Sequence, residues 1–159
     1  MRFATVLFLI LLLLPSVAFA DQIEDGQAAF DRHDYKTALK LWRPLAEQGD
    51  PKAQVNIGVM YDHALGVKQD FAEAMKWYRK AADRGNAAAQ VNLGMMYQKG
   101  WGVKQDYVQA YMWLSLATGG NVNGEKELDQ IAAKMTPEQV AEAKRLIIDR
   151  KLTSLPQQP

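Results

Sequence analysis

The chain of 159 residues contains no cysteine and only two histidines, His33 and His63. The absence of cysteine excludes disulfide bonds, thiolate metal ligands and a cysteine nucleophile. The two histidines lie 30 residues apart, which is not a ligand spacing for zinc. We read His63 and its neighbour Asp62 as an exposed pair at a loop edge, and the sequence predicts neither a metal site nor a cofactor.

The chain also lacks an excess of charge of either sign. It has 19 lysines and arginines against 18 aspartates and glutamates. Proteins that bind nucleic acid need a clear basic excess for their phosphate contacts, so we do not expect a nucleic-acid partner. A glycine-rich phosphate loop, a paired-histidine motif and a Ser-x-x-Lys motif are all absent as well. We therefore predict that the protein is not an enzyme.

Long apolar runs are absent except at the N-terminus. There Arg2 precedes nine apolar residues, 6–14, and Ala18-Phe19-Ala20 places small residues at −3 and −1 of a cut after Ala20. This is the pattern of a secretory signal peptide, residues 1–20. An uncleaved anchor would need about 20 apolar residues. We expect a periplasmic or secreted mature chain that begins at Asp21 and keeps no stable membrane anchor.

The rest of the chain is a repeat with a period of 36 residues. Residues 49–84 and 85–120 align with sixteen identical positions in 36. Residues 21–48 form a shorter first unit, in which Tyr35 and Ala38 match Phe71 and Ala74. A period of this size is typical of stacked helix pairs, each too small to bury its own apolar face.

Each full unit is predicted to contain a helix A, a loop and a helix B. In the third unit we expect helix A over 87–98, capped by Asn86, and helix B after the cap Asp106. Gly58 and Gly94 lie inside the two A helices, where a glycine costs about 1 kcal/mol relative to alanine. The repeated cost indicates a close approach of helix B, with Ala74 and Ala110 as its small contact residues.

The ends of the domain differ from these two units. The first unit is predicted to hold helices over 22–32 and 35–48, joined by a tight turn. Residues 121–151 are predicted to form a cap, with one helix over 124–134 and another that begins at Thr136-Pro137. We expect a disordered tail over 152–159. The predicted fold is therefore all-α: an α-α solenoid over 21–151, with about three helix pairs and a C-terminal capping helix pair.

The pattern A-Q-x-N-[IL]-G-x-M-Y, followed by G-V-K-Q-D-[FY], occurs twice in full. It resembles the Sel-one-like repeat (SLR) family, a relative of tetratricopeptide repeats. The resemblance implies a right-handed solenoid whose A helices line a concave face, and a function as an adaptor that binds a protein or an extended peptide. One departure is Ala64, which stands where the third unit has Gly100.

The candidate binding site rests on this resemblance. Asn56 and Asn92 match a position that often faces the groove of tetratricopeptide proteins and bonds a bound peptide. Helical spacing places other side chains beside them, so the predicted contact set is Lys52, Asn56, Val59, Asn92, Met95 and Lys99. In the alternative interpretation each asparagine holds the inter-helix loop of its unit.

Trp101 is a further candidate, because it lies between two glycines in a loop. It either covers the gap between the helices of its own unit or stands exposed for a partner. By contrast, Trp42, Trp77 and Trp113 recur in B helices and are predicted to pack in the core.

Two functions remain open at this stage. The first is an exported adaptor with a protein or peptide partner. The second is an accessory protein associated with peptidoglycan or carbohydrate, or a β-lactam-type hydrolase of the cell envelope. Members of the family described as acting on β-lactams are rich in cysteine, which this chain lacks.

Overall fold

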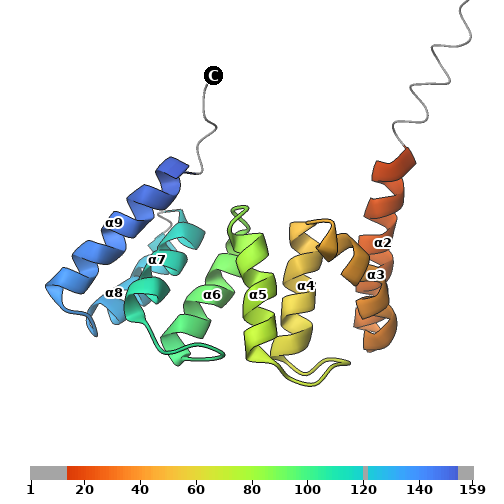
Figure 1. Cartoon of the computed structure of the whole chain (residues 1–159), viewed down its shortest axis with the longest axis horizontal. Helices are drawn as coiled ribbons and strands as arrows, with labels where there is room; N and C mark the ends of the chain where they lie inside the picture. The colour runs from red at the N-terminus through yellow and green to blue at the C-terminus, as the bar shows by residue number, and fades with distance from the viewer. Residues whose placement is uncertain (1–13, 120–121, 154–159) are drawn as a thin grey trace, which may run out of the picture.

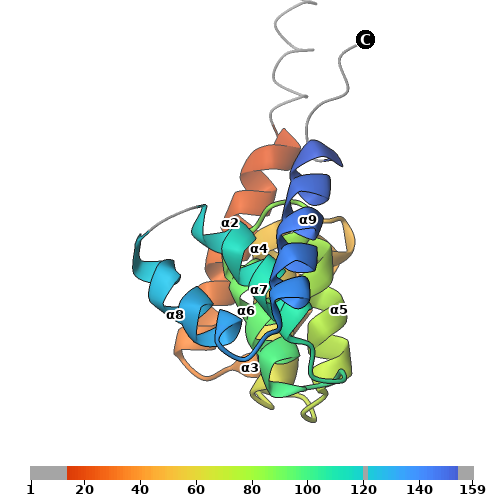
Figure 2. The same ribbon diagram turned by 90° about the vertical axis from the view of Figure 1, so that its left-hand side faces the viewer.

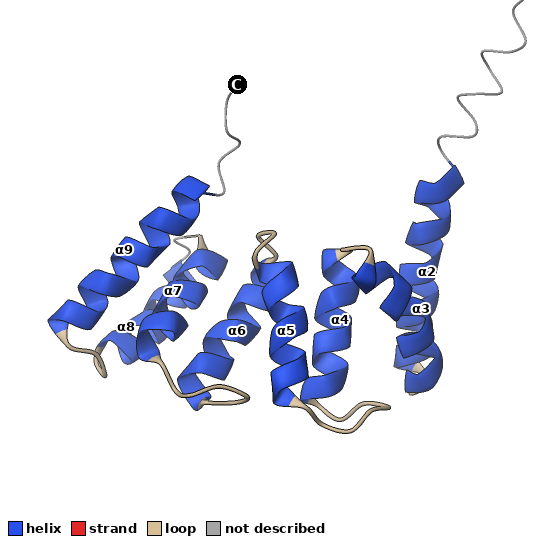
Figure 3. Ribbon diagram, in the orientation of Figure 1, coloured by secondary structure: helices blue, strands red, loops and turns tan. Residues whose placement is uncertain are grey.

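The computed structural model describes residues 14–119 and 122–153, and these residues form eight helices and no strand (Figures 1 and 3). The helices are α2 (Leu14–Asp31), α3 (Tyr35–Glu47), α4 (Pro51–Asp62), α5 (Phe71–Ala82), α6 (Ala87–Lys99), α7 (Tyr107–Thr118), α8 (Val122–Ala132) and α9 (Pro137–Thr153). The all-α prediction is confirmed.

Consecutive helices pack against each other from α2 to α8 and form one extended row (Figure 1). The pairs α2/α3, α4/α5 and α6/α7 correspond to the three predicted units. Longer loops join the helices within the second and third units, and tight turns join one unit to the next (Figure 3). This arrangement is the predicted solenoid of helix pairs.

The helices of the repeat begin where the sequence places a capping side chain. In each case a side-chain oxygen accepts a hydrogen bond from the backbone N–H three residues further on, which satisfies one free donor of the first turn. The four bonds run from Ala53 to Asp50, from Glu73 to Asp70, from Ala89 to Asn86 and from Gln109 to Asp106, over 2.7–3.0 Å.

Repeated glutamines join one unit to the next. The Nε2 group of Gln54 donates to the carbonyl of Ala46 over 3.0 Å, and that of Gln90 donates to the carbonyl of Ala82 over 3.2 Å. Both glutamines are buried, and each bonds the last turn of the preceding B helix. Each carbonyl also accepts a backbone N–H, from Gly49 or Gly85, so the glutamine adds a second bond that ties helix A of one unit to helix B of the unit before it.

A second repeated contact joins an arginine of helix B to a tyrosine of the next helix A. The Arg43 guanidinium donates to the Tyr61 hydroxyl over 3.1 Å, and that of Arg79 donates to the Tyr97 hydroxyl over 2.6 Å. The two contacts are 36 residues apart, so they belong to the same geometry between units. Trp42, Trp77 and Trp113 are buried, as predicted.

The interior glycines do mark a close approach of helix B, but the partners differ from the prediction. A Cβ atom on Gly58 would lie 2.5 Å from the Tyr78 ring, and one on Gly94 would lie 2.5 Å from the Leu114 Cγ. Ala74 and Ala110 are buried, but they are not the nearest neighbours. The glycines therefore make room for a large side chain of helix B, Tyr78 or Leu114, which lies four residues after the predicted alanine.

The two capping helices separate around α7. Both α8 and α9 pack against α7, and they lie on opposite sides of it when the solenoid is viewed from its C-terminal end (Figure 2). An ion pair of 2.7 Å between Arg150 of α9 and Asp83, at the end of α5, extends this contact to the second unit. α9 thus packs on the side of α7 from which it reaches the end of α5, while α8 continues the row of consecutive helices.

Both ends differ from their predicted boundaries. α2 extends beyond the predicted start at Gln22 to Leu14, where the described residues begin, because no helix breaker lies between Ser16 and Gln22. Ala18 and Ala20 thus lie in α2, and the predicted leader up to residue 13 lies outside the described residues. α9 extends to Thr153, so residues 152–153 are helical rather than part of the predicted tail, and the rest of that tail, 154–159, lies outside the described residues. No described helix is long and apolar enough to cross a membrane.

Candidate functional site

The predicted binding residues form two matching stripes on α4 and α6. Spacings of three and four residues place Lys52, Asn56 and Val59 on one face of α4, and Asn92, Met95 and Lys99 on the equivalent face of α6. The two lysines are exposed, and the other four side chains are half-buried. We call these six residues the A-helix stripe.

The asparagines of the A-helix stripe do not hold the loops. That role belongs to Gln69, whose amide donates to the carbonyl of Asp62, and to Gln105, whose amide donates to the carbonyl of Gln98, each over 2.7 Å. Asn56 and Asn92 make no hydrogen bond within the described part of the chain, and the Asn56 Nδ2 atom is shielded from solvent without a partner. The alternative interpretation is therefore wrong.

Trp101 packs on the preceding unit rather than on its own. Its ring stacks on that of Phe71, the first residue of α5, with 5.6 Å between ring centroids and 14° between ring planes. The next residue, Gly102, has a φ of +68°, and a Cβ there would lie 2.6 Å from the Phe71 backbone. The tryptophan remains 42% exposed, so part of its ring covers the contact between the second and third units and the rest faces solvent.

A cavity of about 580 Å³ lies between α5, α7 and α9. Its lining combines an apolar part with charged and polar groups from three helices. The residues are Arg79, Asp83, Gln109, Met112, Leu146, Asp149, Arg150 and Thr153. We call this space the α9 cavity. Sequence reasoning missed it, because no local pattern brings α9 onto α5.

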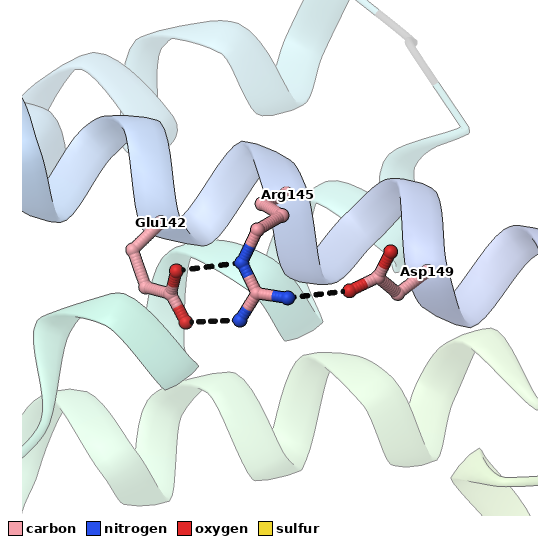
Figure 4. Close-up of polar contacts among 3 residues, drawn as sticks. All are labelled: Glu142, Arg145 and Asp149. Atoms are coloured by element: carbon pink, nitrogen blue, oxygen red, sulfur yellow. Dashed lines mark hydrogen bonds and ion pairs between the residues drawn. The ribbon is translucent and has the colours of Figure 1, made fainter.

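Most of the charges around the α9 cavity are paired. Asp83 accepts from Arg150. Asp149 accepts from Arg145 over 2.8 Å, and two nitrogens of Arg145 also bond Glu142 (Figure 4). These bonds raise the pKa of Arg145 and lower that of Glu142, mainly through the hydrogen bonds between the two side chains. Asp149 and Glu142 therefore share the single positive charge of Arg145.

Arg79 differs from these residues, because it has no carboxylate partner among the described residues. Its guanidinium donates to the Tyr97 hydroxyl, and its central carbon lies 4.8 Å from the centroid of the Trp113 ring. Arg150 lies 4.1 Å from the same ring. The indole of Trp113 is buried, and its N–H has no hydrogen-bond partner in the described part of the chain. Arg79 thus lines the cavity with a guanidinium whose contacts, the Tyr97 hydroxyl and the Trp113 ring, are uncharged.

The other polar groups identified from the sequence stay apart. His63 is exposed, and its Nε2 lies 3.9 Å from a carboxylate oxygen of Asp62. His33 is exposed beside Tyr35. No three histidine, aspartate or glutamate side chains between residues 14 and 153, leaving out the undescribed 120–121, lie close enough to share a metal ion.

Comparison with known proteins agrees with this architecture. The family model of the Sel1 repeat matches residues 23–50, 51–86 and 87–119. These three matches coincide with the helix pairs α2/α3, α4/α5 and α6/α7, within a few residues. A search of curated protein sequences gave no significant match.

Two solved structures are similar to this chain over most of its length. One is a protective antigen with an SLR fold from uropathogenic Escherichia coli, with 31% identity, a TM-score of 0.77, and coverage of 89% of this chain and 33% of the antigen. The other is a Sel1 repeat protein from Oxalobacter formigenes, with 29% identity, a TM-score of 0.65, and coverage of 80% and 55%. The chain thus spans a third of the first protein and about half of the second.

Proposed function

The chain belongs to the Sel1 repeat family, whose members generally act as scaffolds for protein–protein interaction, and we propose that it is an exported, non-catalytic adaptor. In this proposal it binds an extended segment of a partner protein along the A-helix stripe. The protein would act in the periplasm or outside the cell, after cleavage behind Ala20.

One observation carries the choice of surface. The repeated glutamines and aspartates have structural roles, since Gln54 and Gln90 join units, Gln69 and Gln105 hold loops, and Asp70 and Asp106 cap helices. The repeated asparagines of the A-helix stripe have no such role, and the Asn56 amide nitrogen is shielded without a partner in the described structure. A buried donor that lacks a partner costs about 1–3 kcal/mol. If the Asn56 amide turns toward the surface, it can donate to a bound main-chain carbonyl, which would remove that cost.

The chemistry of the stripe suits an extended main chain. Each asparagine amide can donate to and accept from a peptide group. Val59 and Met95 lie beside them and offer apolar contact, with methionine able to adapt its shape. A full carboxylate clamp is not expected, because Ala88 stands in the third unit where the second has Lys52.

The proposal can be tested by affinity capture from envelope proteins with the purified mature chain and a double variant, Asn56→Ala with Asn92→Ala. We expect the double variant to lose the partners that the unaltered chain captures. The matched control is Lys68→Ala with Lys104→Ala, because these residues repeat at the same interval and are exposed in the loops. Equal capture by both variants, each shown to melt normally, would remove the A-helix stripe from consideration.

Export has its own test. N-terminal sequencing of the protein recovered from the periplasm or the medium should begin at Asp21. Recovery of the chain in a membrane fraction with residues 1–20 intact would contradict the proposed export and leave the binding proposal standing.

A further inference from the structure

We propose that the α9 cavity is a second binding site, which takes an acidic side chain and a neighbouring aliphatic side chain from an extended segment of a partner protein. Its lining residues come from α5, α7 and α9, whereas the A-helix stripe lies on α4 and α6. The two sites therefore share no residue. The α9 cavity can thus be tested whether or not the proposed adaptor groove is correct.

The acidic component follows from the balance of charge in the cavity. Arg150 is paired with Asp83 over 2.7 Å, and Asp149 is paired with Arg145 over 2.8 Å. Arg79 is left with a tyrosine hydroxyl and an aromatic ring as its contacts. The four charges of the lining sum to zero, but Arg79 is the one among them without an oppositely charged partner within ion-pair distance in the described structure, and a carboxylate is the group that complements its free N–H donors.

The position of Arg79 is fixed before any ligand arrives. Its hydrogen bond to Tyr97 and its contact with the Trp113 ring hold the guanidinium from two directions. A preorganised guanidinium loses less conformational entropy on binding than a free surface arginine does. Part of its donor set remains available, because only one of its nitrogens is bonded to Tyr97.

The aliphatic component follows from the rest of the lining. Met112 of α7 is only 3% exposed, and Leu146 of α9 is half-buried against the same core cluster. Their exposed atoms form an apolar part of the cavity, about 580 Å³ in total, which suits one or two side chains rather than a folded domain. The Gln109 side chain has no hydrogen bond in the described structure and can meet a peptide group.

The occupant is thus a short acidic–aliphatic segment, and the probe can be synthetic. We would titrate the purified protein with an acetylated and amidated hexapeptide in which glutamate and leucine alternate. Two-dimensional NMR would follow the indole N–H of Trp113 and the side-chain amide of Gln109. We expect these two signals to move together and the affinity to fall with added salt.

Two altered peptides separate the two components. A peptide with glutamine in place of glutamate should bind about tenfold more weakly, since a charge-assisted hydrogen bond is lost. A peptide with serine in place of leucine should also bind more weakly. Equal binding of the glutamine peptide to the unaltered protein would overturn the acidic assignment without any need for a protein variant.

The protein variants form a matched pair, Arg79→Gln and Arg43→Gln. Each removes the same arginine–tyrosine bond between units, but Arg43 does not line the α9 cavity. We expect Arg79→Gln to weaken binding about tenfold and Arg43→Gln by less than about twofold. Equal effects of the two changes would show that the cavity cation is not a ligand contact.

Two other occupants would also overturn the proposal. If the chain's own tail filled the cavity, a variant that ends at Thr153 would bind the peptide at least about tenfold more tightly than the full chain. If a second copy filled it, the Trp113 and Gln109 signals would move with protein concentration in the absence of peptide.

Discussion

Replacing Gly94 with alanine should overpack the contact between α6 and α7. The new Cβ would lie 2.5 Å from the Cγ of Leu114 and 3.0 and 3.2 Å from its two terminal carbons. Leu114 is only 3% exposed, and its Cγ is a branch point close to the backbone. It can withdraw only by leaving its rotamer or by moving α7 outward, and both displace the core around it.

The size of the effect combines two opposing contributions. Overpacking costs about 1–3 kcal/mol. The exchange of glycine for alanine inside a helix returns about 1 kcal/mol. We therefore expect Gly94→Ala to lower the free energy of unfolding by about 0–2 kcal/mol, with the balance set by how far Leu114 can move.

A double-mutant cycle removes that ambiguity. Leu114→Ala alone should cost about 2–5 kcal/mol because it leaves a cavity. In the double variant the methyl group added at position 94 enters the space that Leu114 vacated, and the gain in helix propensity remains. The double variant should therefore be more stable than the sum of the single changes predicts, by about 1–3 kcal/mol.

The assay is urea unfolding followed by circular dichroism, with the same slope required for all four proteins. Leu45→Ala combined with Gly94→Ala serves as the control, because Leu45 is buried in α3 of the first unit. These two changes should add within about 0.5 kcal/mol. If Gly94→Ala and Leu114→Ala also added, the close approach would not explain the interior glycine.

Three further changes probe other contacts. Burial raises the pKa of Tyr78, so above a pH of about 10 the unfolded chain ionises first and stability falls by up to about 1.4 kcal/mol per pH unit; Tyr78→Phe should remove that slope in urea titrations at alkaline pH, and an unchanged slope would refute it. Gln90→Ala removes the side-chain bond to the Ala82 carbonyl, which keeps its backbone bond from Gly85, and should cost about 0.5–1.5 kcal/mol in the same assay; an unchanged free energy of unfolding would show that this bond does not hold the units together. Arg150→Ala breaks the ion pair to Asp83 and should speed amide hydrogen exchange in α9 but not in α4, whereas uniform acceleration would contradict a local contact.

The boundaries of the repeat were predictable because local chemistry determines them. Asp70 and Asp106 cap α5 and α7, which begin at the next residue in each case. The same side chain that stabilises the first turn is visible in the sequence, so helix starts need no tertiary information. α2 was the exception, because nothing in the segment from Ser16 to Gln22 interrupts a helix.

Contacts between helices were predicted less well, because they depend on how neighbouring helices rotate against each other, both within a unit and between units. The spacing placed Ala110 opposite Gly94, whereas the structure places Leu114 there. Trp101 was expected either in the gap of its own unit or fully exposed, yet it stacks on Phe71 of the unit before. The crossing angle between neighbouring helices decides both contacts, and the repeat pattern does not contain that angle.

The two candidate sites also differ in whether local sequence spacing could predict them. The A-helix stripe could be found from the sequence, since its residues are neighbours on single helices. The α9 cavity could not, because Asp83 and Arg150 are 67 residues apart and meet only through the fold. The cavity forms where α9 packs against α7 apart from α8, an arrangement that the predicted capping helix pair did not specify.

The departures from the repeat nevertheless carried a signal about that surface. At positions where α5 has Glu73, Lys76, Arg79 and Lys80, α7 has Gln109, Met112, Ser115 and Leu116. The Lys76 side chain is exposed, whereas Met112 is buried, because α9 lies over this side of α7 and would leave a lysine there without water. Two of these four substituted residues, Gln109 and Met112, line the α9 cavity, beside Arg79 of the unit that kept its charge. In a repeat protein the identical positions report how units stack. The positions where one unit loses the charges of another report which surface is covered, and here that surface is the side of α7 beneath α9, which forms one wall of the α9 cavity.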